Sequence, residues 1–116
     1  MKVNELRIGN YVFSAEDNKN GEVFQIDSRG IIFVNKNGNR WQDLKNIQPI
    51  PLTEEILLKC GFEKDENKMF VFNRKVIYKK NDNTFHFYCC DIEIKYLHQL
   101  QNLYFALTGQ ELEINL

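Results

Sequence analysis

The two prolines of the 116-residue chain, Pro49 and Pro51, are the feature that most constrains its fold. Proline fixes its own φ angle and biases the preceding residue toward extended backbone, so a helix or a central strand does not continue through this segment. The prolines therefore predict a boundary between two lobes, which we place at residues 1–48 and 52–116. A chain of this length has no room for a multidomain enzyme, and we expect both lobes to pack as one compact unit.

Short apolar segments separated by turn residues fill the first lobe. The candidate strands cover residues 6–13, 22–26, 31–34 and 40–47. Asn37-Gly38 is the strongest hairpin signal in the chain, because both residues tolerate a positive φ angle. Strands this short, joined by tight turns, predict a small SH3-like antiparallel β-barrel.

The second lobe mixes helical and strand patterns. Thr53 precedes Glu54 and Glu55, and this order is typical of a helix N-cap followed by a negatively charged first turn. Three strands are expected next, over residues 69–72, 75–78 and 84–89. Apolar residues at helical spacing predict a second helix over 96–108, and residues 111–116 alternate like an edge strand. This order predicts an α+β fold, with an α-β-β-β-α lobe whose helices pack on one face of the sheet.

Composition and hydropathy exclude several classes of protein. The formal net charge of −1 argues against a general nucleic-acid coat, which needs a concentrated positive surface. No apolar run approaches the roughly 18 residues of a membrane span, and the N-terminus shows no apolar signal-peptide segment. We therefore expect a protein of the cytoplasm, where its three cysteines are reduced thiols.

No motif indicates catalysis, a metal or a cofactor. The six glycines are too scattered for a phosphate-binding loop. His86 and Cys89 form the only close pair of zinc-ligand types, and on one strand they would point to opposite faces. Cys89 or Cys90 beside a histidine such as His98 could act as a nucleophile, but no signature of a cysteine hydrolase surrounds them. We therefore expect no enzyme activity and keep a hydrolase as the third hypothesis.

Basic and aromatic residues gather along one predicted hairpin. They are Arg74, Lys75, Tyr78, Lys79 and Lys80. Such interleaving can bind a single strand of nucleic acid through phosphate contacts and base stacking. The hairpin supports our alternative hypothesis, a small nucleic-acid-binding module, and a solvated hairpin without a ligand is the structural alternative.

The predicted helix over residues 96–108 carries an aromatic residue, Phe105, on its polar side. His98, Gln101 and Asn102 lie on the same side at about 100° per residue. An exposed aromatic side chain among polar ones is typical of a protein-interaction anchor, unless another lobe covers it. We therefore predict a partner-binding surface at Phe105, His98, Gln101 and Asn102.

Three segments carry a resemblance to known proteins. They are the opening Leu6–Asn10, the segment PIPLTEEILLKCGF at residues 49–62, and the segment KYLHQLQNLYFALTGQEL at residues 95–112. Together they resemble small uncharacterised proteins of phages and prophages in Bacteroidetes-type bacteria. The resemblance implies no catalytic residue, and small phage proteins without catalytic motifs often act by binding.

From this resemblance, the leading hypothesis is a non-enzymatic phage-type accessory protein in the cytoplasm of a bacterial host cell. Such a protein would bind a host macromolecule, and an anti-CRISPR-like inhibitor of a defence nuclease is the most specific form of the hypothesis. The expected partner is a host or phage protein, such as a CRISPR effector ribonucleoprotein, with a contact to RNA or DNA as a further option. No membrane partner is expected.

Overall fold

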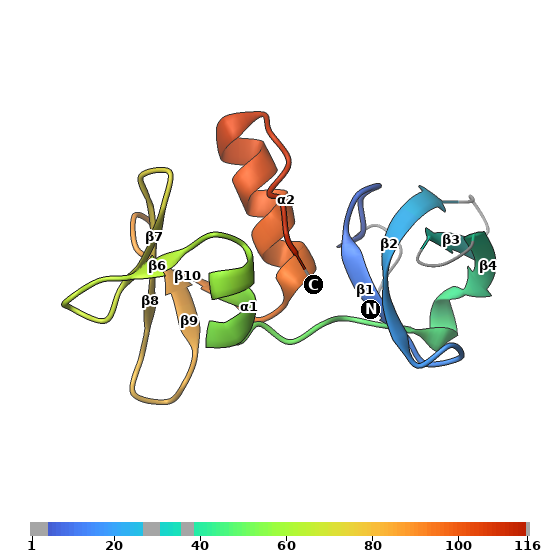
Figure 1. Ribbon diagram of the computed structural model, residues 1–116, viewed down its shortest axis with the longest axis horizontal. Coiled ribbons are helices and arrows are strands. Elements are labelled where there is room, and N and C mark those ends of the chain that lie inside the picture. Colours follow the sequence, from blue (N-terminus) through green and yellow to red (C-terminus); the bar gives the residue numbers. More distant parts are fainter. Residues whose placement is uncertain (1–4, 27–30, 36–38, 116) are drawn as a thin grey trace. The chain divides into compact units, whose positions relative to one another are not determined.

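The computed structural model describes residues 5–26, 31–35 and 39–115 (Figure 1). Within these residues the fold is α+β, with two antiparallel five-stranded sheets and two α-helices. The chain divides into two compact units. Unit 1 consists of Met1–Ile50 and Leu97–Glu111, and unit 2 consists of Pro51–Tyr96 and Leu112–Leu116. None of the helices in the described residues has the length and apolar character needed to cross a membrane.

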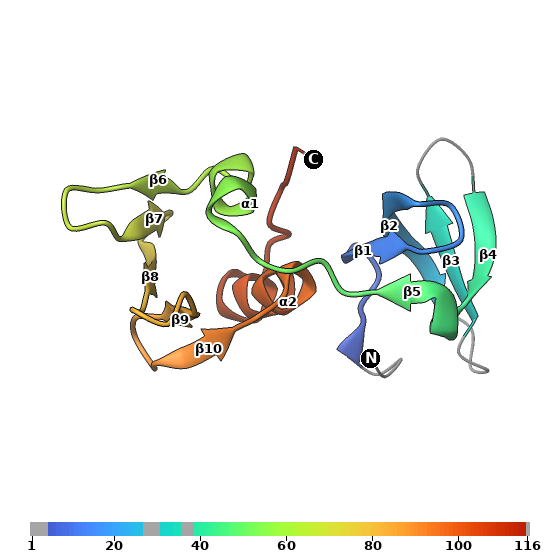
Figure 2. The same cartoon turned by 90° about the horizontal axis from the view of Figure 1, so that it is seen from below.

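The sheet of unit 1 is an antiparallel meander whose last strand returns to pair with the first. Its elements are β1 (Tyr11–Ser14), β2 (Lys19–Ile26), β3 (Ile31–Asn35), β4 (Asn39–Asp43), the 3-10 turn η2 (Leu44–Asn46) and β5 (Ile47–Gln48). The strand order is β4-β3-β2-β1-β5, and Figure 2 shows β5 beside β1. In the described residues no ladder joins β4 to β5, so this sheet is open and the predicted closed barrel is wrong.

Local sequence explains where the strand predictions for unit 1 succeed and fail. The predicted turn at Asn37-Gly38 lies outside the described residues, but the strands on either side of it pair antiparallel as expected. The predicted strand over residues 6–13 begins only at Tyr11, because Gly9 takes a φ angle of +98° and turns the chain. Val12 and Val23 are fully buried and pack with Leu6 and Ile47 in the core of this unit.

Unit 2 opens with a short helix followed by five strands. Its elements are α1 (Glu54–Lys59), β6 (Glu63–Lys64), β7 (Phe70–Phe72), β8 (Lys75–Lys79), β9 (Phe85–Phe87) and β10 (Ile92–Ile94). Thr53 caps α1 as predicted, since its hydroxyl accepts a hydrogen bond from Ile56 N at 3.2 Å. The sheet order is β10-β9-β8-β7-β6, so the three predicted strands gain a neighbour on each side.

The register of this sheet decides which side chains share a face. Lys64 pairs with Phe70, Phe70 pairs with Ile77, and Ile77 pairs with Phe87. Directly paired residues point to the same side of a sheet, so Lys64 lies on the face that buries these apolar side chains. Lys79 is two residues beyond Ile77 and therefore lies on that same face.

The second helix, α2 (Leu97–Thr108), belongs to unit 1 rather than to the predicted lobe over residues 52–116. Leu97 N donates to Ile50 O at 2.9 Å, and the side chain of Gln101 bonds the backbone around β1. The predicted edge strand at residues 111–116 is also wrong for the described residues 111–115, which form no strand. That both lobes pack as one compact unit stays a prediction.

Candidate anion-binding site

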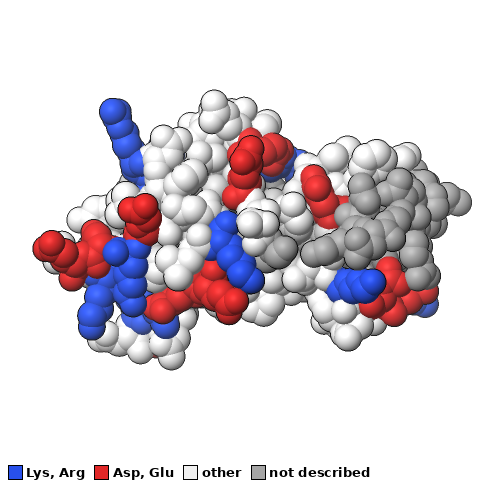
Figure 3. Space-filling model, viewed as in Figure 1, with Lys and Arg blue, Asp and Glu red and all other residues white. Residues whose placement is uncertain are grey.

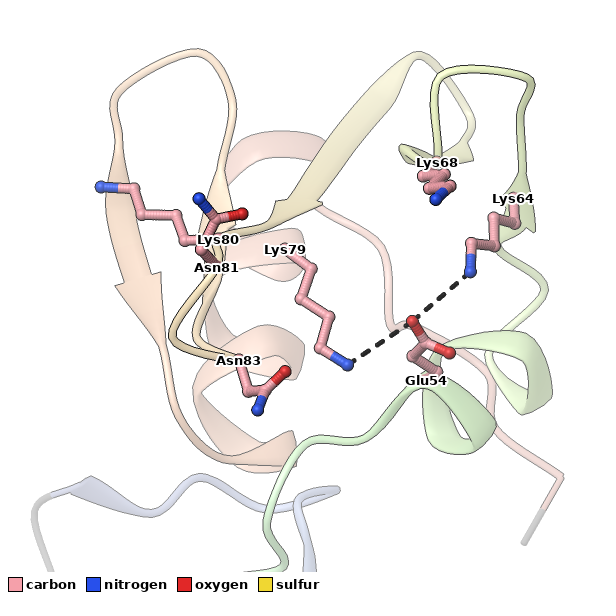
Figure 4. A pocket seen from close by; sticks show the side chains of 7 residues that line it. All are labelled: Glu54, Lys64, Lys68, Lys79, Lys80, Asn81 and Asn83. Carbon is pink, nitrogen blue, oxygen red and sulfur yellow. Dashed lines mark ion pairs between the residues drawn. The ribbon is translucent and has the colours of Figure 1, made fainter.

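A cavity of about 290 Å³ opens in unit 2 where α1, β6 and the β8–β9 turn meet (Figure 4). Its lining is almost entirely polar and mostly basic. The lining residues are Glu54, Lys64, Lys68, Lys79, Lys80, Asn81 and Asn83. Three lysines, Lys64, Lys68 and Lys79, stand against one carboxylate in this lining and give it a net positive charge, although the chain as a whole carries −1.

Two of the lysines converge on one carboxylate oxygen. Lys64 Nζ lies 3.5 Å from Glu54 Oε1, and Lys79 Nζ lies 3.7 Å from the same atom. Figure 4 shows both ammonium groups pointing toward Glu54, one from β6 and the other from β8. One negative charge thus faces two positive charges at this point, so the group retains a net positive charge.

Two of the cavity lysines lie over buried aromatic rings. Lys64 Nζ lies 5.7 Å from the Phe70 ring centroid, and Lys79 Nζ lies 5.7 Å from the Phe85 centroid. The two rings contact each other edge to face at 6.2 Å and are almost completely buried. An ammonium group within about 6 Å of an aromatic ring centroid is attracted to the face of the ring, so each ring helps to hold its lysine at the cavity.

Two Asp-stabilised turns hold the rim of the cavity. In the turn that carries Lys68, Asp65 Oδ1 accepts from Asn67 N and Met69 N, both at 2.9 Å. In the β8–β9 turn, Asp82 Oδ1 accepts from the Thr84 hydroxyl at 2.6 Å. The hydrogen bonds from the Thr84 hydroxyl and backbone N–H hold the pKa of Asp82 below its ordinary value, and an aspartate at such a position fixes each of the two turns.

Aromatic side chains cluster on the opposite face of the same sheet. The Tyr78 ring stacks on His86 at 5.6 Å and meets Tyr88 edge to face at 6.1 Å. The Tyr78 hydroxyl donates to Asp91, which lowers the pKa of that carboxyl and raises the pKa of Tyr78. Tyr88 is 60% exposed.

The structure separates the basic and aromatic residues that the sequence grouped along one hairpin. Arg74 lies in the turn before β8 and Lys75 is the first residue of that strand, whereas Lys79 is its last residue, about 13 Å from Lys75 at the rise of a strand. Tyr78 points to the face opposite Lys79. Lys80 links the two faces, because it lines the cavity while its Nζ lies 3.5 Å from Asp91 Oδ1 and 6.0 Å from the Tyr78 ring.

Sequence reasoning missed five of the seven lining residues. They are Glu54, Lys64, Lys68, Asn81 and Asn83. For Lys64, only the register of the sheet indicates the site. The register places Lys64 opposite Phe70 and therefore on the same face as Lys79. Because β6 is only two residues long, its pairing partner was not visible from periodicity.

The helix surface predicted to bind a partner lies largely inside unit 1. Gln101 is 1% exposed and His98 is 3% exposed, while Asn102 accepts from Asn10 Nδ2 at 2.8 Å and donates to Glu5 O. Phe105 is 39% exposed, and the Arg7 guanidinium carbon lies 4.3 Å from its ring centroid. Phe105 therefore stays at the surface, whereas Gln101 and His98 are buried and do not present a partner-binding face.

The surroundings of Cys60 and Cys89 oppose formation of a thiolate. Cys60 is buried, and this raises its pKa to about 12. Cys89 and Cys90 are exposed with their sulfurs 3.7 Å apart, and desolvation followed by the Cys90 contact raises the pKa of Cys89. A catalytic thiol needs a lowered pKa, so this geometry gives no support to a nucleophile. In the described residues no three His, Cys, Asp or Glu side chains gather as metal ligands.

Comparison of the chain with protein-family models, with curated proteins and with solved structures finds no match. The geometry of the cavity is therefore what bears on the function of the site. Its distinctive property is a cluster of lysine ammonium groups over buried aromatic rings, on one face of a sheet whose other face carries an exposed tyrosine. Figure 3 shows basic side chains gathered over unit 2, with acidic side chains beside them.

Proposed function

We propose that the protein is a non-enzymatic binding protein whose unit 2 holds single-stranded nucleic acid, with a backbone phosphate in the lysine cavity. The observation that carries this proposal is the convergence of lysines from two strands and two turns on one cavity that contains a single carboxylate. Lysine is a common phosphate ligand because its compact charge donates up to three hydrogen bonds.

The proposed binding depends on local arrangement rather than on net charge. Unit 2 contains eight Lys and Arg against nine Asp and Glu, so as a whole it does not attract a polyanion. The attraction is confined to the cavity, where Lys64, Lys68 and Lys79 face the same space. We therefore expect few phosphate contacts, a modest affinity and a salt dependence that corresponds to one or two phosphates.

The aromatic residues on the opposite face of the sheet favour a single strand over a duplex. Lys80 lines the cavity and also lies against Tyr78, whose ring contacts the exposed Tyr88. A strand that places a phosphate in the cavity can follow Lys80 around the end of the β8–β9 hairpin and stack a base on Tyr88. Stacking of this kind requires an unpaired base and tolerates any sequence.

The broader expectations from the sequence remain proposals alongside this one. A phage-type accessory protein of the bacterial cytoplasm that inhibits a CRISPR effector would gain from a strand-binding unit, because such effectors carry RNA and displaced DNA. For unit 1 we propose an SH3-like arrangement, supported by the pairing of β5 with β1 and by the one-turn helix before β5.

The test of the proposed function is fluorescence anisotropy with a labelled oligothymidylate of about 12 nucleotides, within the usual range of site sizes. Lys79→Ala should weaken binding about 5–10-fold and lower the salt slope by about 0.7, the value for one phosphate on a single strand. Lys59→Ala is the matched control, because Lys59 pairs with Glu55 and lies outside the cavity. Equal affinities for the two variants, or no binding by the wild-type protein at low salt, would refute the proposal.

A further inference from the structure

We infer that Glu54 is an internal counter-ion of the lysine cavity, and that an incoming phosphate group displaces its carboxylate from Lys64 and Lys79. This inference rests on the proposed function and adds how the site is controlled. It assigns to Glu54 the position that a ligand phosphate takes, so that this one residue limits the affinity of the cavity. The geometry, the weakness of the existing contacts and the remaining cavity lining each support it.

The geometry places one carboxylate oxygen where two distant lysines meet. Lys64 and Lys79 come from β6 and β8, which are separated by β7 and therefore by about 10 Å of sheet. Both side chains nevertheless reach toward Glu54 Oε1, at 3.5 Å and 3.7 Å. Two ammonium groups that converge on one oxygen from separate strands form the arrangement that a phosphate oxygen requires.

The contacts that Glu54 makes are weak enough to be exchanged. A charge-assisted N–H···O bond is about 2.7–2.9 Å long, and both distances here are well beyond that range. The Glu54 side chain is 41% exposed, and exposed ion pairs contribute little net stability because water and salt screen them. Glu54 is also the first residue of α1, from which its side chain can rotate into solvent without disturbing the helix.

The rest of the cavity offers further donors that Glu54 does not use. Lys68 lines the cavity and makes no ion pair within the described part of the chain, and Asn81 and Asn83 add side-chain amides. The volume of about 290 Å³ is several times the roughly 30 Å³ that one water occupies in the liquid. A phosphate group therefore has space beside Lys68. There it can accept hydrogen bonds from donors that make no contact with the Glu54 carboxylate.

The consequence is a specific change when the carboxylate is neutralised. In the wild-type protein Glu54 cancels part of the lysine charge, so fewer counterions are released when a strand binds. Glu54→Gln keeps the size of the side chain and removes its charge. We expect Glu54→Gln to bind the labelled oligothymidylate about 3–10-fold more tightly, with a salt slope steeper by about 0.7.

Glu55→Gln is the matched control for this experiment. Glu55 is the next residue in the first turn of α1, and its carboxylate pairs with Lys59 at 3.3 Å instead of facing the cavity. The two variants make the same change in net charge and in helix-dipole interaction, so any difference between them comes from the cavity. Addition of Lys79→Ala to Glu54→Gln should abolish most of the gain, because the phosphate then loses the lysine that Glu54 had neutralised.

The outcomes separate this inference from the proposed function. Tighter binding by Glu54→Gln than by Glu55→Gln, with the steeper salt slope, supports the counter-ion role. Equal binding by these two variants, while Lys79→Ala still weakens binding, overturns the counter-ion role and leaves the proposed function standing. Absence of binding by both the wild-type protein and Glu54→Gln overturns both.

Discussion

Substitution of Gln101 by alanine is expected to destabilise unit 1 strongly, although Gln101 lies on what the sequence presents as the polar side of a helix. The side chain is 1% exposed and satisfies two backbone groups of the segment that enters β1. Its Oε1 accepts from Tyr11 N at 2.8 Å, and its Nε2 donates to Gly9 O at 3.0 Å. Alanine has neither the carbonyl nor the amide group of glutamine. The substitution therefore leaves Tyr11 N–H and Gly9 C=O without these hydrogen bonds.

The expected magnitude follows from these two bonds. A buried polar group that loses its partner costs about 1–3 kcal/mol, and two such groups give about 2–4 kcal/mol when part of the loss is recovered by water. Against a total stability of about 5–15 kcal/mol this is a large fraction. The midpoint of thermal unfolding should fall by about 10 °C for a domain of this size.

Urea denaturation followed by tryptophan fluorescence measures this effect, because Trp41 is the chain's only tryptophan and belongs to β4 of unit 1. Gln101→Met tests the cause, since methionine keeps most of the volume while it removes the hydrogen bonds. Gln99→Ala is the matched control, because Gln99 is exposed on the same helix and should change stability by about 0.5 kcal/mol or less. A loss for Gln101→Ala no larger than that for Gln99→Ala would refute the reasoning.

Two further predictions concern titratable groups. Burial lowers the pKa of His98, partly opposed by the Glu5 carboxylate, so the unfolded chain takes up a proton at higher pH than the folded protein. Stability should therefore decrease as the pH falls below about 6.5, and His98→Gln should flatten that part of the urea-denaturation profile; an unchanged profile would contradict this. Because Cys60 is buried with a pKa of about 12 while Cys89 and Cys90 are exposed, a thiol reagent should modify two cysteines in the native protein and the third only in denaturant. Three rapidly reacting thiols would show that Cys60 is accessible.

Local signals in the sequence predicted much of the secondary structure. Thr53 caps α1, and apolar residues at helical spacing located α2 to within a residue. Between β9 and β10 the chain makes a complete turn, in which Asp91 N donates to Phe87 O and Asp91 takes a φ angle of +53°.

Long-range packing explains the predictions that failed. Periodicity showed that Gln101 and Asn102 share the polar side of a helix, but it did not show that this side faces Gly9 and Asn10. Polar side chains that satisfy irregular backbone are buried as fully as apolar ones, and hydropathy does not distinguish them from solvated residues. The same limit applies to the cavity, whose lysines are brought together by the pairing of β6 with β7.

The position of the cavity follows from how little of the sheet α1 covers by itself. Six helical residues extend about 9 Å, whereas five strands span about 19 Å across their width. Beside α1 the Lys64 ammonium group lies over the Phe70 ring, and the Lys79 ammonium group lies over the Phe85 ring. Leucine or methionine would cover these rings equally well without requiring a counter-ion. Lysine at both positions adds two positive charges that packing does not need, and the proposed phosphate ligand would give these charges a role.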